Sequence, residues 1–127
     1  MHEKVLLVDD EPDFLEAMAA RMQVRGLDVT TTTSTIDALS MAGSGHFDVI
    51  VMDLMMPEMA GLEALKALKD LKPESQIILL TGYATREIEA EALKLGAVDL
   101  IEKPADIERL LEKIREARSK KKVNSEQ

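Results

Sequence analysis

Acidic residues directly follow two short apolar runs of the sequence. One acidic run occupies residues 9–11, after the apolar residues 5–8, and Asp53 follows the apolar residues 49–52. Near-continuous apolar runs are typical of parallel strands buried on both faces, and such strands end at one edge of their sheet. Carboxylates gathered at one edge repel one another unless a cation is bound. The pattern therefore predicts a site for a hard divalent cation such as Mg²⁺, which prefers oxygen ligands.

A nucleophile, a cation and a hydroxyl group are predicted at the same edge. With a divalent cation bound, Asp53 can stay ionised and attack a phosphoryl group to form an aspartyl-phosphate. Phosphoryl transfer needs mainly positioning and charge neutralisation. Lys103 comes shortly after residues 98–101, an apolar run interrupted by Asp99, and can supply a cation. Thr81 follows residues 77–80 and can donate a hydroxyl hydrogen bond. Each residue alone is an ordinary turn or surface residue, but together they match one phosphoryl site.

The elements that must position these residues form a regular alternation. Four apolar runs and a weaker segment at residues 28–32 predict strands. The segments between them place apolar residues at helical spacing, as in Leu62, Leu65 and Leu68. Pro12 is suited to a first helical turn, and Gly26 and Gly96 to positions just after a helix. The predicted strands cover residues 5–8, 28–32, 49–52, 77–80 and 98–101. We therefore expect an α/β fold, a single doubly wound, five-stranded parallel sheet with five helices on its two faces.

Composition excludes several other classes of protein. The chain has 127 residues, a net charge of -8, no cysteine and three aromatic residues, Phe14, Phe47 and Tyr83. An acidic surface with few rings disfavours nucleic acid and anionic lipid as partners. The lack of cysteine excludes disulfides, and no apolar run approaches the length of a membrane span. We therefore expect a cytoplasmic protein that binds neither nucleic acid nor membrane.

Four strings of residues resemble the response-regulator receiver domain of two-component signalling. They are Val8-Asp9-Asp10-Glu11, the stretch DLMMPEMAG at 53–61, LTGY at 80–83 and Glu102-Lys103-Pro104. The resemblance runs in order from about residue 4 to residue 117. It implies a CheY-like sheet with strand order 2-1-3-4-5, the order that the flavodoxin-like folds share.

The resemblance also implies a role for each site residue. Asp53 accepts a phosphoryl group from a histidine kinase or a histidine phosphotransfer protein. Asp10 and Asp53 bind Mg²⁺ directly, Asp9 binds it through water, and the main-chain carbonyl of Met55 completes the protein ligands.

On the same basis, Lys103 contacts the phosphoryl group and Thr81 shifts toward it on activation. The peptide bond between Lys103 and Pro104 is expected to be cis. Such a domain is a signalling module that catalyses only its own phosphorylation and dephosphorylation.

Two features of the sequence affect how phosphorylation changes the surface of the domain and how long the phosphorylated state lasts. Leu100 occupies the position, three residues before Lys103, where the family usually carries Tyr or Phe, so switching by an aromatic ring is in doubt. Met55 and Tyr83 lie two residues after Asp53 and Thr81, positions that flank the phosphoryl group in the family. Their bulk predicts exclusion of water and a long-lived phosphorylated state.

The resemblance predicts a division of the chain and a surface for partners. Residues 1–118 are expected to form the receiver domain and residues 119–127 a basic, polar tail. The family's output face corresponds to residues 85–118, which could contact a downstream protein or a fused output domain. It could also form a homodimer on phosphorylation.

Three other functions would use parts of the same pattern. A pseudo-receiver would use the fold as a protein-interaction scaffold without phosphorylation, but would be expected to lack Asp53, Lys103 or an acidic residue of the pair. A phosphatase of the haloacid-dehalogenase type would carry an aspartate where this chain has Met55. A nucleotide-binding flavodoxin-like protein would carry a glycine-rich loop after the first strand, where this sequence is acidic.

Overall fold

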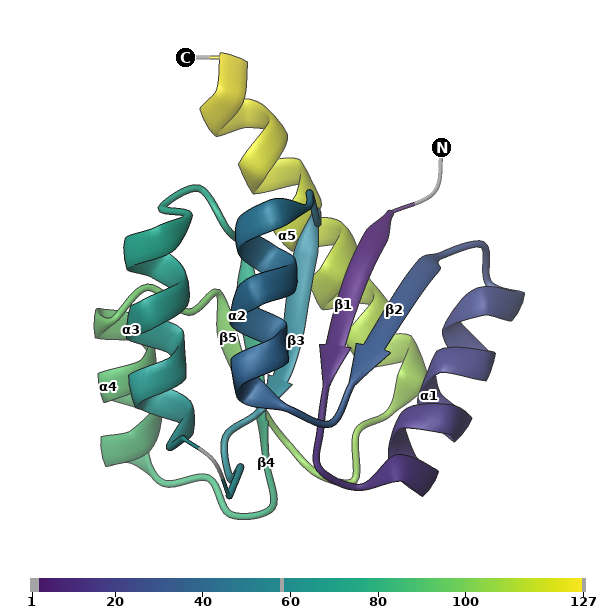
Figure 1. Ribbon diagram of the computed structural model, residues 1–127, viewed down its shortest axis with the longest axis horizontal. Coiled ribbons are helices and arrows are strands. Elements are labelled where there is room, and N and C mark those ends of the chain that lie inside the picture. The colour runs from purple at the N-terminus through teal and green to yellow at the C-terminus, as the bar shows by residue number, and fades with distance from the viewer. Residues whose placement is uncertain (1–2, 58, 127) are drawn as a thin grey trace.

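The chain alternates strands and helices along its whole described length. The computed structural model describes residues 3–57 and 59–126, with side chains described up to residue 119. The elements are β1 (Lys4–Val8), α1 (Pro12–Val24), β2 (Asp28–Thr32), α2 (Thr35–Ser44), β3 (Val49–Asp53), α3 (Gly61–Leu71), β4 (Ile77–Thr81), α4 (Arg86–Lys94), β5 (Asp99–Glu102) and α5 (Ile107–Glu126) (Figure 1). The predicted alternation of five strands with five helices is confirmed.

All five strands pair in parallel in one sheet. Their order is β2-β1-β3-β4-β5, as the family resemblance implied. The ladder between β3 and β4 pairs Asp53 with Leu80, and the ladder between β4 and β5 pairs Thr81 with Glu102. The last residues of neighbouring strands are thereby held side by side by backbone hydrogen bonds.

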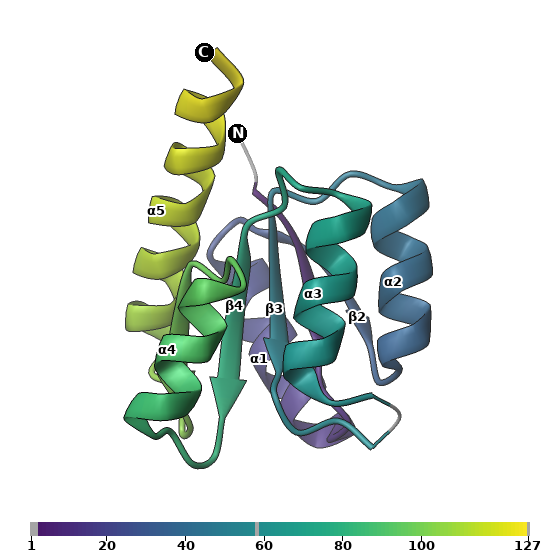
Figure 2. The same ribbon diagram turned by 90° about the vertical axis from the view of Figure 1, so that its left-hand side faces the viewer.

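The sheet separates two apolar cores. Side chains of successive strand residues point to opposite faces, so in β1 Leu6 and Val8 face one core and Val5 and Leu7 face the other. Helices α2, α3 and α4 cover the first core, and α1 and α5 cover the second. Figure 2, which looks along the sheet, places α5 on one side and α2 and α3 on the other. Burial on both faces explains the continuous apolar runs in β1, β3 and β4, whereas the edge strand β2 is polar and only partly buried.

Helix ends follow the local signals of the sequence. Pro12 begins α1. Gly26 and Gly96 come just after α1 and α4 with φ of 90° and 107°, a region that glycine enters without steric cost. The Ser34 side chain accepts a hydrogen bond of 3.1 Å from the Asp37 amide and caps α2.

The observed strand ends differ slightly from the predicted ones, and the difference matters for the site. β3 and β4 each extend one residue further, through Asp53 and Thr81. The predicted fifth strand covered residues 98–101, whereas β5 spans Asp99–Glu102. The prediction was therefore wrong by one residue at each end. Pairing with β4 starts at Asp99 and continues through the polar Glu102, so hydrogen bonding rather than hydropathy sets the limits.

Helix α5 spans 20 residues and continues to Glu126. Its backbone therefore remains helical across residue 118, where the receiver domain was predicted to end. Side chains of the predicted tail after residue 119 lie outside the described part of the chain. In the part of the chain that the structure describes, no helix is both long and apolar enough to cross a membrane.

Candidate phosphoryl and metal site

Carboxylates from two strand ends form a tight cluster at one edge of the sheet. One carboxylate oxygen each from Asp9, Asp10, Glu11 and Asp53 lies within 4.8 Å of the others. The cluster lies where β1 and β3 end, at the lower edge of the sheet in Figure 1. Asp9 is fully buried and Asp53 is 5% exposed, whereas Asp10 and Glu11 are exposed. The predicted gathering of acidic residues is confirmed, and Glu11 joins it although the predicted site did not include it.

Lys103 supplies a positive charge to this cluster. Its Nζ lies 2.7 Å from Asp9 Oδ2, 3.3 Å from Asp53 Oδ2 and 3.5 Å from Glu11 Oε1. Burial disfavours the charged ammonium, but the hydrogen bond and charge of Asp9 and the charge of Asp53 outweigh burial and raise the pKa of Lys103. The lysine is therefore a permanent cation at neutral pH.

Asp9 is held in place at an electrostatic cost. Its Oδ1 accepts a hydrogen bond of 2.9 Å from the Glu11 amide. Burial raises the pKa of Asp9, and the hydrogen bonds from Lys103 and from the Glu11 amide offset only part of this effect. One ammonium group thus compensates the cluster incompletely, which favours the binding of a further cation.

The carboxylate of Asp53 is oriented by its own loop. Asp53 Oδ1 accepts a hydrogen bond of 3.1 Å from the Met55 amide, while Oδ2 lies nearest to Lys103. The backbone amide of Lys103 donates to the Thr81 carbonyl at 2.7 Å, which continues the β4–β5 ladder beyond its last pair. The peptide bond between Lys103 and Pro104 is cis, as the resemblance implied.

Thr81 lies at the same edge, but its hydroxyl is engaged elsewhere. The side chain is 1% exposed, and Oγ1 lies 3.2 Å from both the amide and the carbonyl of Tyr83. The Glu102 side chain accepts a hydrogen bond of 3.0 Å from the Ala84 amide in the same loop. Sequence reasoning did not identify this role of Glu102, because it depends on the pairing of β5 beside β4.

The structure shows the surroundings of Leu100, Met55 and Tyr83. Leu100 is 4% exposed and packs into the core that α2, α3 and α4 cover, so an aliphatic side chain fills the position of the usual ring. Met55 and Tyr83 are 71% and 74% exposed. Their bulk therefore lies on the surface of the loops that flank the site.

The aromatic ring of Phe14 also contacts Lys103. The centroid of Phe14 lies 4.5 Å from Lys103 Nζ. Sequence reasoning identified Phe14 only as one of the three aromatic residues of the chain. No spacing rule could have revealed the contact, because it joins α1 to the end of β5.

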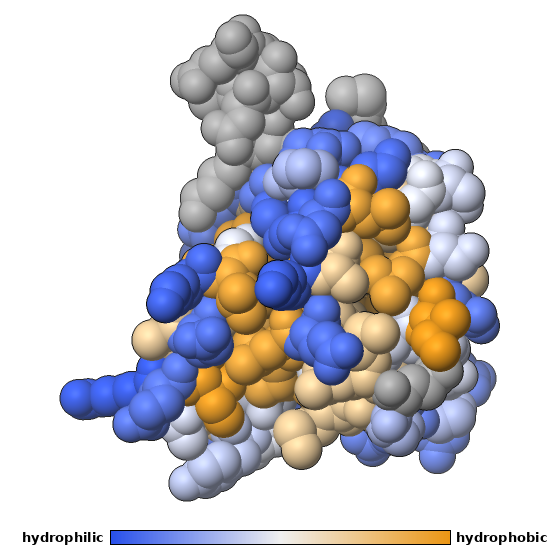
Figure 3. All heavy atoms as spheres, turned by 60° about the vertical axis from the view of Figure 1, so that its left-hand side comes forward, coloured by the Kyte–Doolittle hydropathy of each residue, from blue (hydrophilic) through white to orange (hydrophobic). Residues whose placement is uncertain are grey.

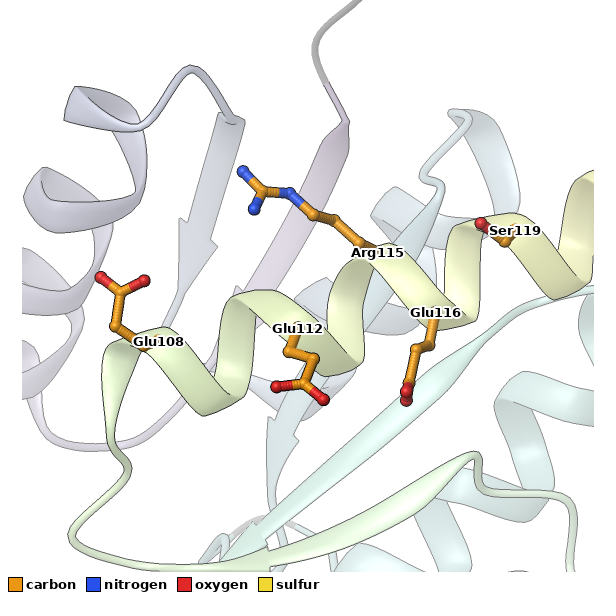
Figure 4. A pocket seen from close by; sticks show the side chains of 5 residues that line it. All are labelled: Glu108, Glu112, Arg115, Glu116 and Ser119. Atoms are coloured by element: carbon orange, nitrogen blue, oxygen red, sulfur yellow. The ribbon is translucent and has the colours of Figure 1, made fainter.

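A surface hollow of about 780 Å³ lies along α5, away from the acidic cluster. Figure 4 shows that the side chains lining it all come from this one helix. They are Glu108, Glu112, Arg115, Glu116 and Ser119. The hollow is thus a charged surface of α5 that extends one residue beyond the 85–118 segment, to Ser119, and holds none of the predicted site residues.

The chain is similar to members of a known protein family. The model of the response regulator receiver domain matches residues 5–115. Regulatory protein AtoC of Escherichia coli K12 is 35% identical over 107 residues, which are 84% of this chain and 23% of AtoC. The chain thus spans about a quarter of this curated relative.

Two solved structures are similar over most of the chain. A response regulator from Burkholderia pseudomallei with a phosphorylated aspartic acid, calcium ion and citrate is 31% identical with a TM-score of 0.83, covering 97% of this chain and 72% of that one. The beryllofluoride-activated NtrC4 receiver domain dimer is 30% identical with a TM-score of 0.88, covering 93% and 98%. With its CheY-like sheet and its acidic strand ends, the chain belongs to the response regulator receiver family of two-component signalling.

Proposed function

We propose that Asp53 is the phosphoacceptor of this receiver domain and that Lys103 and Thr81 assist it. The position of the Asp53 carboxylate carries this proposal. One oxygen is held by the Met55 amide, and the other lies 3.3 Å from the Lys103 ammonium. A fixed nucleophile with a cation beside it suits a reaction in which negative charge must be neutralised.

In the transfer, an Asp53 oxygen forms a bond to phosphorus, and the bond from phosphorus to the donor histidine nitrogen breaks. The electron pair of the broken bond leaves on the imidazole, which takes up a proton from water. Lys103 is close enough to Asp53 to contact a phosphoryl oxygen. Thr81 can bind another oxygen only after its hydroxyl leaves the Tyr83 backbone, so activation requires rearrangement of the loop after β4.

The donor set of the acidic cluster fits Mg²⁺. The cluster offers hard carboxylate oxygens and, among the described residues, more negative charge than the contact with Lys103 neutralises. We assign Asp10, Asp53 and the Met55 main-chain carbonyl as direct ligands and Asp9 as a ligand through water. When bound, Mg²⁺ would neutralise charge on the carboxylates and on the phosphoryl oxygens.

Phosphorylation by acetyl phosphate tests this proposal directly. With MgCl₂ present, intact-mass spectrometry should find the mass of one added phosphoryl group on the unmodified chain and none on Asp53→Asn. Asp70→Asn, which alters an exposed aspartate on α3, should be phosphorylated normally. An unmodified chain that accepts no phosphoryl group, or binds no beryllofluoride, would favour the pseudo-receiver alternative.

The partners follow from the same proposal. The phosphoryl donor is a histidine kinase or a histidine phosphotransfer protein, and a downstream protein or fused output domain reads the 85–118 face. Residues 1–118 are the receiver unit and residues 119–127 a basic tail, in the cytoplasm where response regulators typically act. AtoC, which extends well beyond the matched region, supports a fused output domain.

The 85–118 face also has the character of a polar interface. On it, Lys113 lies 3.3 Å from Asp99 of β5 and 3.4 Å from Glu116 of α5. Apolar side chains emerge among charged ones over α4, which belongs to this face, and over the neighbouring α3, which does not (Figure 3). One structural relative is an activated receiver dimer. We therefore propose phosphorylation-dependent dimerisation through this face.

Light scattering decides whether the dimer forms. The mass should double when beryllofluoride and Mg²⁺ are added, and Arg115→Glu on the charged surface of α5 should prevent this increase. Glu63→Lys, an exposed charge reversal on α3, is the control and should still dimerise. Identical masses with and without beryllofluoride would dismiss the dimer and leave a downstream protein as the partner.

A further inference from the structure

The ring of Phe14 is an uncharged group in contact with the Lys103 ammonium, which is otherwise surrounded by carboxylates. Its centroid is 4.5 Å from Lys103 Nζ, within the range in which a cation is attracted to the face of an aromatic ring. The other described contacts of the ammonium are the carboxylates of Asp9, Asp53 and Glu11. The contact with the ring therefore differs in kind from the other three.

Those carboxylates also belong to the cluster that fits a divalent cation. Asp9, Glu11 and Asp53 each contribute an oxygen to it. With the proposed ligands, a bound cation competes with Lys103 for the carboxylates of Asp53 and Asp9. The longest contact, 3.5 Å to the exposed Glu11, remains, so the hold of the carboxylates on a long, flexible side chain is weakened. The ring offers no oxygen ligand to such a cation. Phe14 can thus hold the ammonium in both states of the site.

The position of Phe14 is set by packing. It lies in the first turn of α1, and the half-buried ring packs against the core that α1 and α5 cover. Phe14 and Lys103 line the same groove of about 470 Å³, together with Pro104 and Ala105 from the loop after β5. A ring anchored in this way is a rigid support for the lysine.

We propose that Phe14 is a positioning residue for phosphoryl transfer, whose ring face keeps the Lys103 ammonium beside Asp53 when Mg²⁺ engages the acidic residues. The role rests on the proposed function of Asp53. It predicts that an aromatic ring at this position, beyond its apolar volume, is needed for fast phosphorylation.

Two substitutions separate the ring face from its volume. Phe14→Leu keeps an apolar side chain but removes the face, and Phe14→Tyr keeps the face. With acetyl phosphate and Mg²⁺, Phe14→Leu should be phosphorylated roughly three- to tenfold more slowly, and Phe14→Tyr at close to the unmodified rate. Phe47→Leu makes the same chemical change against the core on the opposite face of the sheet and should leave the rate unchanged.

A spectroscopic measurement reports the contact itself. In ¹H–¹³C NMR spectra, the ring should shift the Lys103 ε-methylene resonance. Phe14→Leu should abolish this shift, both without and with Mg²⁺, and Phe14→Tyr should retain it. Circular dichroism and thermal unfolding establish that each variant is folded.

The outcomes are distinguishable. If the unmodified chain is phosphorylated and Phe14→Leu reacts equally fast, or if the Lys103 resonance is the same in both, the role of the ring is overturned while the role of Asp53 stands. If Phe14→Leu and Phe14→Tyr are slowed equally, the hydrocarbon packing rather than the ring face is responsible. If the unmodified chain accepts no phosphoryl group, the proposed function fails and this role fails with it.

Discussion

Asp9 is a fully buried carboxylate, and burial raises its pKa above the ordinary value of 3.8. A carboxyl group whose pKa is higher in the folded state contributes stability at a pH below its unfolded pKa, and this contribution is lost as the pH rises through the folded pKa. Above the unfolded pKa of 3.8, burial of Asp9 therefore destabilises the fold when no divalent cation is bound. The same carboxylate charge attracts Mg²⁺. Asp9 therefore lowers the stability of the cation-free fold and favours binding of the cation.

Replacing Asp9 with asparagine should relieve this cost. We expect Asp9→Asn to raise the free energy of unfolding at neutral pH without Mg²⁺, because Lys103 retains its contacts with Asp53 and Glu11. The gain should shrink as the pH falls toward 3.8, where the unfolded carboxyl group is also protonated. Urea unfolding at several pH values measures this, with the exposed Asp10→Asn for comparison. A less stable Asp9→Asn would mean that the ion pair with Lys103 outweighs burial.

Tyr83 and Met55 belong to the two loops that leave the site, because their backbones hydrogen-bond to the side chains of Thr81 and Asp53. Both side chains are largely exposed, and we expect them to fold over a phosphoryl group on Asp53 and exclude water. Tyr83→Ala should accelerate phosphoryl loss several-fold once the donor is removed. Val24→Ala, which trims an exposed apolar side chain at the far end of α1, should not. Loss from the unmodified chain within seconds to a minute would contradict the long-lived state, and an unchanged rate in Tyr83→Ala would exclude the tyrosine.

At the scale of elements, the loop between β3 and α3 is held at Gly61. Its amide donates a hydrogen bond of 2.8 Å to the Leu54 carbonyl. A Cβ added there would lie 2.5 Å from Leu54 Cα and would also collide with the Leu54 carbonyl oxygen. Leu54 directly follows Asp53, so the start of α3 is packed against the chain next to the phosphoacceptor.

Gly61→Ala should therefore destabilise the protein by about 1–3 kcal/mol, since backbone atoms must move to admit the methyl group. Gly82→Ala is a matched control, because a Cβ at Gly82 meets nothing within 4 Å and φ there is not positive. Urea unfolding measures both variants. Equal stabilities of Gly61→Ala and the unmodified chain would show that the loop shifts freely.

The loop between β4 and α4 is tethered by side chains at both of its ends. Thr81 bonds to the Tyr83 backbone, and Glu102 accepts from the Ala84 amide. One such hydrogen bond contributes about 0.5–1.5 kcal/mol, so Glu102→Ala should speed amide exchange of Ala84 by up to about tenfold. Glu89→Ala, an exposed glutamate on α4, should leave that exchange unchanged. Unaltered exchange in Glu102→Ala would mean that Thr81 alone holds the loop.

At the scale of the whole molecule, the net charge of -8 and the acidic cluster affect stability together. A ligand that binds only the folded state stabilises it by about 2.7 kcal/mol at 100 times its Kd. Saturating MgCl₂ should accordingly raise the thermal midpoint by several degrees. NaCl of equal ionic strength should have a smaller effect, because it only screens surface charge.

The controls for this prediction are Asp10→Asn, which removes a proposed ligand, and Asp70→Asn, which removes an exposed charge on α3. Asp10→Asn should lose most of the magnesium-dependent rise in the thermal midpoint, whereas Asp70→Asn should retain it. Equal rises in MgCl₂ and NaCl would contradict a specific site.

The helices, the strands and the edge at which the strands end could be predicted from the pattern of apolar residues alone. Strands buried on both faces need continuous apolar runs, so their limits were predicted to within one residue. Asp53, Thr81 and Lys103 were identified because each follows such a run and parallel strands end together. The strand order and the role of each residue came from the family resemblance.

The side-chain contacts within the site could not be predicted from the sequence, because they depend on how the elements pack together. The contacts of Lys103 with Asp9 and with the ring of Phe14, and that of Glu102 with the Ala84 amide, join segments far apart in the chain. Such contacts depend on how each helix packs on the sheet and how each loop leaves its strand. Periodicity describes the face of one element, whereas a contact depends on the relative placement of two, which the packing of the whole core establishes.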